Sequence, residues 1–456
     1  MLRPKEEERP LMPDIPFPRL DRRAFLKAAL ATTAATAGLA LASSRGGSGA
    51  LAQNTPVRIV IAGAGAAGLA VAAQLTRRLD RAEITLIDDR ITHLYQPGFT
   101  LVAAGLWNPE RVQWANANYV PSGVRWVRSH AAEFDPETNR VVTQDGTAVP
   151  YDFLIVTTGL DLRYDLIDGM EQGLIGPDNR IGSVYAGPEA AFRTWQAMAK
   201  FREQGGDAVF TRPPGDLKCA GAPLKMTFVT DDRLREVGMR SRARMTYAAH
   251  DGTLFSVKPV NEKVKELFAG RDIEVAYSHV LESVEPGRRI ARFRHGTETV
   301  EMRYDFLHVV PPMRAAPPVA DGPLSWKEGP FAAQGWLEVD RATLQHRRYP
   351  NIFGVGDVNG VPRGKTAASV KWQAPVVAQN LIDTIAGKQP SATYNGYTSC
   401  PMITRIGQAM LVEFDYEGRL IPTLPLIDPL AESWAAWIVE EKALRPVYAA
   451  MLRGYG

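Results

Sequence analysis

The chain has 456 residues, of which 45% are hydrophobic and 23% are charged, and its formal net charge is +3. This length is too great for one hydrophobic core and favours two or three domains, while the composition is ordinary for a globular protein. The small net charge argues against the strongly basic class of nucleic-acid binders, so we expect no nucleic-acid partner.

Residues 1–52 are predicted to be an export signal of the twin-arginine type. The sequence DRRAFLK carries the pair Arg22 and Arg23, and the segment ends in the small-residue cleavage pattern ALAQ. The apolar stretch Ala28–Ala42 is too short for a membrane span, although a retained amphipathic anchor is the alternative. The segment holds eight of the 53 Lys and Arg residues and five of the 50 Asp and Glu residues, so the mature chain is expected to be neutral.

The clearest local pattern begins at Val57–Ala62, a short apolar run that predicts a buried strand. The sequence GAGAAG follows, with Gly63, Gly65 and Gly68, and leads into an alanine- and leucine-rich helix. A second predicted strand, EITLIDD, contains Asp88, twenty residues after the last of these glycines. This is the dinucleotide-binding fingerprint in its strand–turn–helix setting, where the glycines admit a pyrophosphate and the aspartate accepts hydrogen bonds from a ribose.

Two later apolar runs, Tyr151–Leu160 and Tyr349–Gly360, predict further buried strands, and the second ends in the sequence GD at Asp357. A long apolar-periodic helix is expected to follow and to end near Gly387, with Pro375 as a kink or boundary. The arrangement resembles the FAD domain of flavoproteins with two dinucleotide-binding domains. In that family the aspartate binds the ribityl–pyrophosphate region, and the helix points its N-terminus at the flavin ring.

A second α/β unit is predicted from the strands Asp207–Pro213 and Arg242–Ala249. In related flavoproteins that use NAD(P)H, a second glycine fingerprint follows the first of these strands. Here the position holds PGDLKCAGAPLK, and no G-x-G-x-x-G occurs between Ala208 and Leu234. We therefore expect Cys219 to occupy the place where a nicotinamide nucleotide docks.

The chain has two cysteines, Cys219 and Cys400. They are either a structural disulfide, which the periplasm permits, or a pair of redox sulfurs. Cys219 follows Lys218 and precedes a predicted helix, and a cation and a helix N-terminus both favour a thiolate. Neither cysteine has metal-type C-x-x-C spacing, and with seven histidines the sequence offers no ligand set for a metal, so no metal site is expected.

With these motifs in place, the chain resembles the sulfide:quinone oxidoreductases, in their mitochondrial-like (type II) branch. The resemblance runs from about His93 to the C-terminus and covers nearly the whole mature chain. The matching sequences, in family order, are HLYQPGFTLVAAG, KCAGAPLK, LHVVPPM, TLQHRRYPNIFGVGD, KTAA, YNGYTSCPMIT, VEFDYEG and MLRGYG.

The resemblance implies an α/β fold with two Rossmann-like dinucleotide-binding domains, a discontinuous FAD domain and a C-terminal amphipathic region in contact with a membrane. The implied boundaries are residues 53–165 and 326–395 for the FAD domain, 166–325 for the second domain with Cys219, and 396–456 for the C-terminal region with Cys400.

The resemblance also implies an FAD-dependent enzyme that oxidises sulfide and reduces a membrane quinone, with FAD bound non-covalently. Cys219 and Cys400 align with the catalytic cysteines: they are joined directly or through a bridging sulfur in the oxidised enzyme, Cys400 carries the persulfide and Cys219 faces the flavin. A small thiol, sulfite or further sulfide is the implied sulfur acceptor. The positions implied for FAD are Gly63, Gly65, Ala66, Ala67, Gly68, Asp88, Gln96, Ala131, Lys225, Asp357, Thr366, Ala367, Ala368, Ser369 and Val370.

The C-terminal stretch Ser433–Gly456 is aromatic, basic and amphipathic, and we expect it to break at Pro446. Since a quinone lies in the bilayer, the stretch is predicted to lie in the membrane interface, which makes the protein monotopic and peripheral on the periplasmic side. The alternative is a pair of helices packed on the core. A homo-oligomer is also left open.

Three other functions share part of this sequence pattern. A flavocytochrome-type sulfide dehydrogenase tethers its flavin through an extra cysteine, which the sequence HLYQPGFT lacks. A membrane NADH:quinone reductase needs the second glycine fingerprint that is missing here. The third is a non-catalytic FAD-binding protein whose two cysteines form a structural disulfide.

Overall fold

Five parallel strands form the first sheet of the protein, which the computed structural model describes over residues 56–455. The predicted export signal, residues 1–52, lies outside the described residues. The strand expected at Val57–Ala62 is confirmed and occupies the centre of the sheet, where it pairs with two neighbours in parallel. In spatial order the strands are β20 (Ile352–Gly354), β9 (Phe153–Val156), β1 (Val57–Ala62), β2 (Ala82–Ile87) and β5 (Arg125–Val127).

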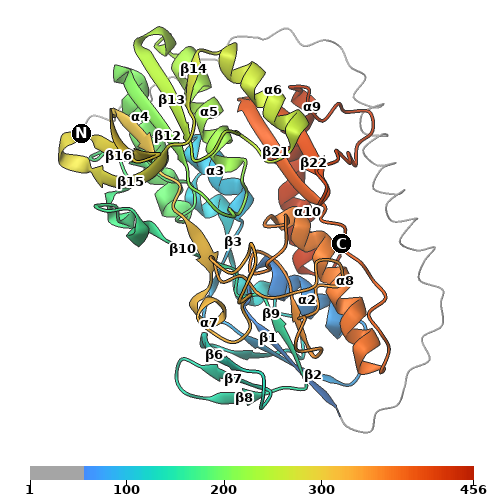
Figure 1. The fold of residues 1–456 in the computed structure, drawn as a ribbon. Coiled ribbons are helices and arrows are strands. Elements are labelled where there is room, and N and C mark those ends of the chain that lie inside the picture. The colour runs from blue at the N-terminus through green and yellow to red at the C-terminus, as the bar shows by residue number, and fades with distance from the viewer. Residues whose placement is uncertain (1–55, 456) are drawn as a thin grey trace, which may run out of the picture. The chain divides into compact units, whose positions relative to one another are not determined.

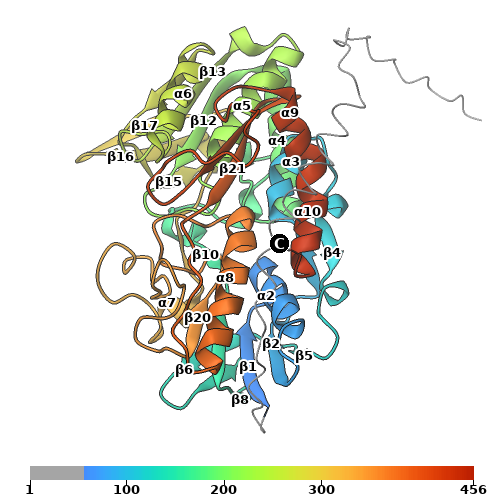
Figure 2. The ribbon, with the colours of Figure 1, turned by 90° about the vertical axis from the view of Figure 1, so that its right-hand side faces the viewer.

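Two helices pack against each other beside this sheet, α2 (Ala66–Thr76) and α8 (Ala367–Ile385) (Figure 2). The helix ends at Ile385, close to the end expected near Gly387, and it runs through Pro375, so the boundary that was one of the two expectations for this proline is wrong. A proline removes one helical hydrogen bond, which is tolerated where the rest of the helix is well packed. Here the buried side chains Val377, Ala378 and Leu381 hold the second half of α8 against the core.

A second parallel sheet of five strands lies in the upper part of Figure 1, with helices α4 (Pro188–Gln204), α5 (Ala222–Glu236) and α6 (Lys258–Ala269) around it. The strands expected at 207–213 and 242–249 are confirmed as β12 and β13, which pair with each other. In spatial order the strands are β11 (Ile181–Gly182), β18 (Phe306–His308), β12 (Gly206–Arg212), β13 (Ala243–Ala249) and β14 (Ile273–Ala276).

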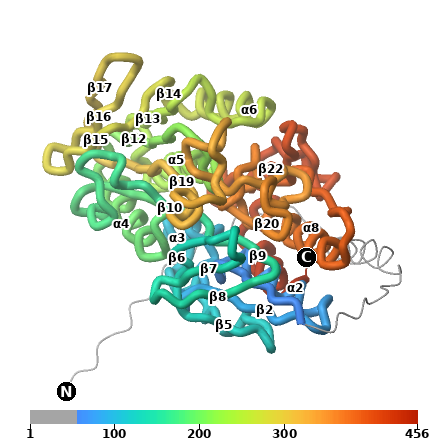
Figure 3. The backbone as a smooth tube through the Cα atoms, turned by 60° about the horizontal axis from the view of Figure 1, so that its bottom comes forward, coloured from blue at the N-terminus to red at the C-terminus, as the bar shows by residue number. Residues whose placement is uncertain are grey.

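The chain crosses between the two sheets on β10 (Leu160–Leu162) and returns on β19 (Met313–Ala315), and these two strands pair antiparallel (Figures 1 and 3). This double crossing makes the first sheet discontinuous in sequence, as expected for the FAD domain. The described residues otherwise form one compact unit, so the boundaries at 165, 325 and 395 stay predictions. Smaller elements are β3 (Thr92–Leu94), β4 (Gln113–Ala115), α3 (Phe99–Ala103), β6 (Ala131–Asp135), β7 (Arg140–Thr143), β8 (Ala148–Pro150), β15 (Val280–Glu285), β16 (Ile290–His295), β17 (Glu298–Arg303) and α7 (Pro317–Ala320).

The C-terminal region begins with a hairpin, β21 (Thr398–Arg405) and β22 (Gln408–Phe414), whose first strand packs on α5. It ends with α9 (Trp434–Ile438), a π-helical turn (Val439–Ala443) and α10 (Leu444–Leu452). The break expected at Pro446 is wrong, because this proline lies in the first turn of α10 after the wider π turn, where a missing N–H is tolerated. Within residues 56–455, no helix is long and apolar enough to cross a membrane.

The apolar stripe of this C-terminal end is divided between the core and the surface. Trp437, Tyr448 and Met451 are buried, and α10 packs against α2 (Figure 2). Trp434 is 53% exposed and Val447 is 44% exposed. Core packing therefore accounts for the buried side chains of the stripe. Contact of the exposed side chains with a membrane stays a prediction.

Candidate active site

The glycine-rich turn between β1 and α2 has the geometry that a dinucleotide requires. Gly63 has φ +115°, and a Cβ on Gly68 would lie 1.8 Å from the Gly63 carbonyl oxygen, so both positions need glycine. Gly65 differs, since a Cβ there would meet nothing within 4 Å, and it stands at the N-terminus of α2 without a side-chain cap. The open backbone and the free N–H groups of α2, which starts at Ala66, fit a pyrophosphate.

Asp88 lies at the end of β2 beside this turn and is 2% exposed. Its carboxylate accepts a hydrogen bond from the backbone N–H of Ala64 (2.6 Å) and pairs with Arg90 (2.9 Å). Burial acts to raise the pKa of Asp88, but the Arg90 charge and these hydrogen bonds outweigh it and hold the pKa below its usual value. Asp88 is therefore an anion next to the glycine turn, and its predicted bond to a ribose stays a prediction.

The N-terminus of α8 meets that of α2 at the end of β20. A Cβ on Gly356 would lie 3.2 Å from the Cβ of Ala67 and 3.6 Å from Cγ2 of Val370, which brings the three elements together. Thr366 caps α8 by accepting a hydrogen bond from the N–H of Ser369. The residues predicted to line FAD at Thr366, Ala367, Ala368, Ser369 and Val370 thus begin α8 beside the glycine turn.

Asp357 and Lys365 lie beside this junction. The Lys365 ammonium donates to the backbone carbonyls of Asp357 (2.9 Å) and Asn359 (2.7 Å) and lies 3.5 Å from the centre of the Trp336 ring. Burial lowers the pKa of Lys365 to about 8, against the pull of nearby carboxylates. Burial also disfavours the charged form of Asp357 and therefore raises its pKa, although the charges of Lys218 and Lys365 oppose this shift. These contacts at Asp357 and Lys365 are compatible with a dinucleotide bound between β1 and α8.

Gln96 and Ala131 are two further positions that were predicted to bind FAD. Gln96 is exposed and accepts a hydrogen bond from the Lys218 ammonium at 2.9 Å, so it reaches the cysteine loop. Ala131 begins β6 and lines a cavity of about 440 Å³ together with His130 and Pro317. The structure therefore links Gln96 to the site through Lys218.

Cys219 is held in the loop between β12 and α5. Its φ of +45° is unusual for a residue with a side chain. Its N–H donates to the Lys365 carbonyl (2.9 Å), and its carbonyl accepts from the N–H of Ala222 (2.8 Å) and the Tyr185 hydroxyl (3.1 Å). The loop that precedes α8 and the start of α5 together fix this cysteine beside the N-terminus of α8.

Cys400 lies on β21, is 3% exposed, and comes close to the Cys219 loop. A Cβ on Gly221 would lie 2.3 Å from the Cys400 sulfur, so glycine at this position allows β21 to approach. Both cysteines are free thiols in the structure. The fold thus brings together two cysteines that the sequence separates widely, as the redox-pair hypothesis requires.

The two thiols have opposite electrostatics. The hydrogen bond with Cys400 outweighs burial and, with help from Lys225 and Lys218, lowers the pKa of Cys219 to about 6. The same hydrogen bond and burial raise the pKa of Cys400 well above its usual value. At neutral pH the pair therefore holds one proton on Cys400 and one negative charge on Cys219.

Lys225 and Glu440 complete the site. Both side chains are 3% exposed, and the Lys225 ammonium lies 3.8 Å from the Glu440 carboxylate. Burial acts to lower the pKa of Lys225, but the charges of Cys219 and Glu440 and a hydrogen bond with Cys219 raise it overall. Sequence reasoning identified Lys225 and missed Glu440. The available signal was its spacing, because Glu440 falls on the same helical face as the buried Trp437 and Tyr448.

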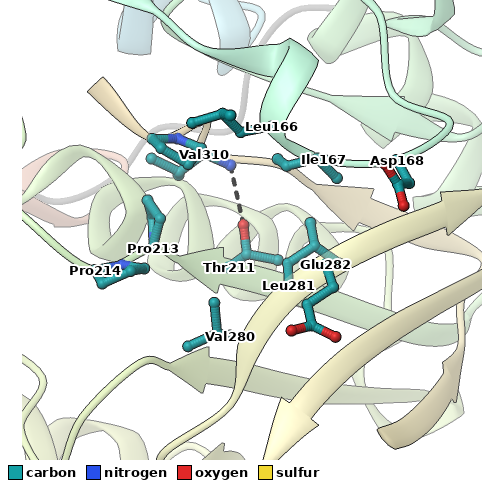
Figure 4. A pocket seen from close by; sticks show the side chains of 11 residues that line it. Leu166, Ile167, Asp168, Thr211, Pro213, Pro214, Val280, Leu281, Glu282 and Val310 are labelled. Atoms are coloured by element: carbon teal, nitrogen blue, oxygen red, sulfur yellow. Dashed lines mark hydrogen bonds between the residues drawn. The ribbon is translucent and has the colours of Figure 1, made fainter. Parts of the chain in front are cut away.

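A cavity of about 410 Å³ lies at the carboxyl ends of β12 and β18, the edge at which a second dinucleotide binds in this type of sheet (Figure 4). Thr211 accepts a hydrogen bond there from the N–H of Val310 (3.0 Å). The charged residues that line the cavity are Asp168 and Glu282, which repel phosphate. The geometry agrees with the missing second fingerprint and does not favour a nicotinamide nucleotide.

Comparisons with known proteins point to one family. The family model described as pyridine nucleotide-disulphide oxidoreductase matches residues 57–185. The chain is 35% identical to the mitochondrial sulfide:quinone oxidoreductase of Mus musculus over 402 residues, which cover 87% of this chain and 86% of the relative. It is 33% identical to the protein of the same name from Dictyostelium discoideum, with the same coverage of both chains.

A solved structure gives the same answer for the fold. The sulfide:quinone oxidoreductase of Aquifex aeolicus matches with a TM-score of 0.72 and 22% identity, over 88% of this chain and 92% of that one. The match confirms the α/β fold with Rossmann-like domains.

Proposed function

The chain belongs to the sulfide:quinone oxidoreductase family, and we propose that Cys219 and Cys400 are the sulfur pair through which it oxidises sulfide. The protein is an FAD-dependent enzyme whose substrates are sulfide and a quinone. The observation that carries the proposal is the approach of Cys400 to the Cys219 loop, beside the junction of α2 and α8. Two cysteines that lie beside a nucleotide-binding turn are better placed for electron transfer to the cofactor than for a purely structural disulfide.

The residues present fit FAD. The backbone from Gly63 to Gly68 and the N-terminus of α2 would hold the pyrophosphate, Asp88 would hold a ribose, and Asp357 would hold the ribityl–pyrophosphate region. Thr366 and the first four residues of α8 would contact the flavin. The binding is non-covalent, because the sequence has no cysteine besides the pair. When bound, FAD supplies a two-electron acceptor that a quinone can reoxidise.

The chemistry of the chain begins with hydrosulfide and the Cys219–Cys400 disulfide. Hydrosulfide attacks the Cys400 sulfur, the S–S bond breaks, and Cys219 leaves with the electron pair as a thiolate. Cys400 then carries the outer sulfur as a persulfide. The low pKa of Cys219 makes it the better leaving group of the two.

The cycle closes when a nucleophile removes the outer sulfur from Cys400. A small thiol, sulfite or further sulfide serves as this acceptor. Cys400 and Cys219 then rejoin as a disulfide, which releases two electrons that bound FAD would accept. The tight turn at Cys219 and the buried position of Cys400 keep the two sulfurs in reach of each other throughout.

Membrane attachment follows from the substrate, since a quinone lies in the bilayer. Leu426 is 97% exposed, and Trp434 and Val447 add further exposed apolar surface to the C-terminal region. Lys442 is exposed in the same region and suits anionic headgroups. We infer a monotopic attachment through this surface.

Export to the periplasm is a proposal of the sequence alone, carried by Arg22 and Arg23. The curated relatives described above are mitochondrial, so they do not support a periplasmic site. Replacement of both arginines by lysine is expected to leave unprocessed protein in the cytoplasm, and unchanged processing would contradict an export signal of this type.

The test of the proposed function is an anaerobic titration with sulfide, in which flavin reduction and reoxidation by a soluble quinone are followed optically. Cys219→Ser and Cys400→Ser should each abolish sulfide-dependent quinone reduction while FAD stays bound, because a hydroxyl is a far weaker nucleophile than a thiolate. Ser399→Ala, next to Cys400 on β21, is the matched control. Normal turnover in either folded cysteine variant would show that the pair is structural.

A further inference from the structure

Two neighbouring glutamates in the π-helical turn Val439–Ala443 have different surroundings. The Glu441 carboxylate accepts a hydrogen bond from the Trp107 indole (3.1 Å) and pairs with Arg111 (3.6 Å). The Glu440 carboxylate instead points to Lys225, within the cysteine site. Glu441 thus ties the turn to the rest of the protein, while Glu440 faces the sulfurs.

The geometry of the Glu440–Lys225 pair indicates that it contributes little to the stability of the folded protein. The N–O distance is 3.8 Å, whereas a strong charge-assisted hydrogen bond measures about 2.7–2.9 Å. A buried carboxylate with one distant partner is unfavourable, and such groups are found where a reaction uses them. Single π-helical turns also occur frequently at functional sites, and this one directs Glu440 inward.

The proposed reaction needs a proton acceptor at Cys400. After the acceptor nucleophile takes the outer sulfur with its charge, Cys400 is left as a thiol. It must lose its proton before its sulfur can bond to Cys219, a step in which bound FAD would take up the two electrons that the oxidation releases. We propose that Glu440 takes this proton through Lys225: the Lys225 ammonium gives a proton to the Glu440 carboxylate and receives one from the Cys400 thiol. This inference rests on the proposed function. The electron pair of the Cys400 thiolate forms the new S–S bond, and the electron pair of the Cys219 thiolate is the one that bound FAD would accept.

The surroundings of Glu440 suit this role. The charged and titratable groups that face it are Lys225 from α5, Cys219 and Cys400, and the Tyr95 hydroxyl from the segment after β3. Burial raises the pKa of Glu440 to about 7, although Lys225 opposes the shift. Glu440 can therefore accept and release a proton at neutral pH, and Lys225 stays charged in between.

The test compares Glu440→Gln with the control Glu441→Gln in the purified holoenzyme. The Glu440 variant should lose about 10²-fold in kcat, the lower range for general acid–base catalysis, and its pH profile should lose the limb near pH 7. The Glu441 variant should keep the profile of the parent enzyme. After sulfide is added, the Glu440 variant should accumulate the long-wavelength band of the Cys219 thiolate beside oxidised flavin, because the pair is opened but slow to rejoin.

A second variant separates the proton from the packing. Glu440→Asp keeps a carboxyl group and should restore the pH limb at a reduced kcat, whereas a merely structural role would leave both variants with the same profile. A parent-like kcat and pH profile in Glu440→Gln would overturn the inference. Activity in Cys400→Ser would instead overturn the proposed function, so the two failures are distinguishable.

Discussion

The turn after β1 and the turn after β12 occupy the same topological position in their two sheets, yet they are used differently. After β1 the backbone at Gly65 faces open space, and α2 starts without a side-chain cap. After β12 the backbone at Gly221 is covered by the Cys400 sulfur, and the second residue of α5 is Pro223, which has no N–H to offer a phosphate. One turn is kept open for a nucleotide, and the other is closed by β21.

The difference shows how one architecture serves two purposes. In both turns a glycine leaves room for a close approach, but the approaching group is a protein sulfur at Gly221 and would be a ligand at Gly65. The cavity that remains at the second sheet is lined by carboxylates, which disfavour a phosphate. The loop after β12, together with Cys400 of β21, therefore places a thiol pair at the position where the first sheet has an open turn.

The largest effect on activity should come from moving Cys400 away from Cys219. In Gly221→Ala the new methyl group would lie 2.3 Å from the Cys400 sulfur and push β21 away. Displacement of reacting groups by about 1 Å costs about 10²-fold in rate, and we expect a loss of kcat of this size with FAD retained. The control is Gly252→Ala, where a Cβ meets nothing within 4 Å, and equal activity in both variants would contradict the close approach.

The matching change in the first turn is Gly65→Ala. The methyl group has room in the protein, so the free energy of unfolding of the FAD-free chain should change by no more than about 0.5 kcal/mol. It would occupy the space of the pyrophosphate, and we expect FAD affinity to fall about tenfold, or about 1.4 kcal/mol. Fluorescence titration with FAD measures this, and unchanged affinity would show that the ligand does not approach Gly65.

The charge balance of the second turn can be tested through Lys225. Because Lys225 and the Cys400 thiol stabilise the Cys219 thiolate, reaction of the reduced protein with an alkylating agent should rise as pH passes through about 6. In Lys225→Met the midpoint should move up by about one pH unit, the usual effect of losing an opposite charge nearby. A midpoint that stays in place would remove Lys225 from the site.

The smallest effect concerns the caps of the two helices at the first sheet. Thr366 caps α8, whereas α2 has no side-chain cap. Thr366→Ala should therefore lower the free energy of unfolding of the FAD-free protein by about 1 kcal/mol. Chemical denaturation measures this value, and no change would show that the hydrogen bond to Ser369 contributes nothing.

Much of the fold could be predicted because its signals are local. Val57–Ala62 and the strands near 207–213 and 242–249 are apolar runs bounded by turns, and each is found where it was expected. The helix boundary considered at Pro375 and the break expected at Pro446 are absent from α8 and α10. The packing of a whole helix overrides one missing hydrogen bond, and such packing is not visible in a local sequence pattern.

The site was predictable only in part. The glycine turn and the two cysteines are distinctive in sequence, so they could be named in advance. Glu440 could not be given a role: its spacing from Trp437 and Tyr448 indicates a buried position at most, and its role depends on a π-helical turn and on a contact with Lys225 on a distant helix. A glutamate in a charged stretch ordinarily indicates a solvated face, and only the assembled structure places this one beside the sulfurs.

The most direct test of the redox pair is to find the sulfur itself. The purified protein is treated with sulfide under anaerobic conditions, its thiols and persulfides are trapped by alkylation, and its peptides are analysed by mass spectrometry. The account predicts one additional sulfur atom on the peptide that contains Cys400 and an alkylated thiol on the peptide that contains Cys219. A Cys219–Cys400 disulfide that survives sulfide unchanged, without added sulfur on either peptide, would contradict it.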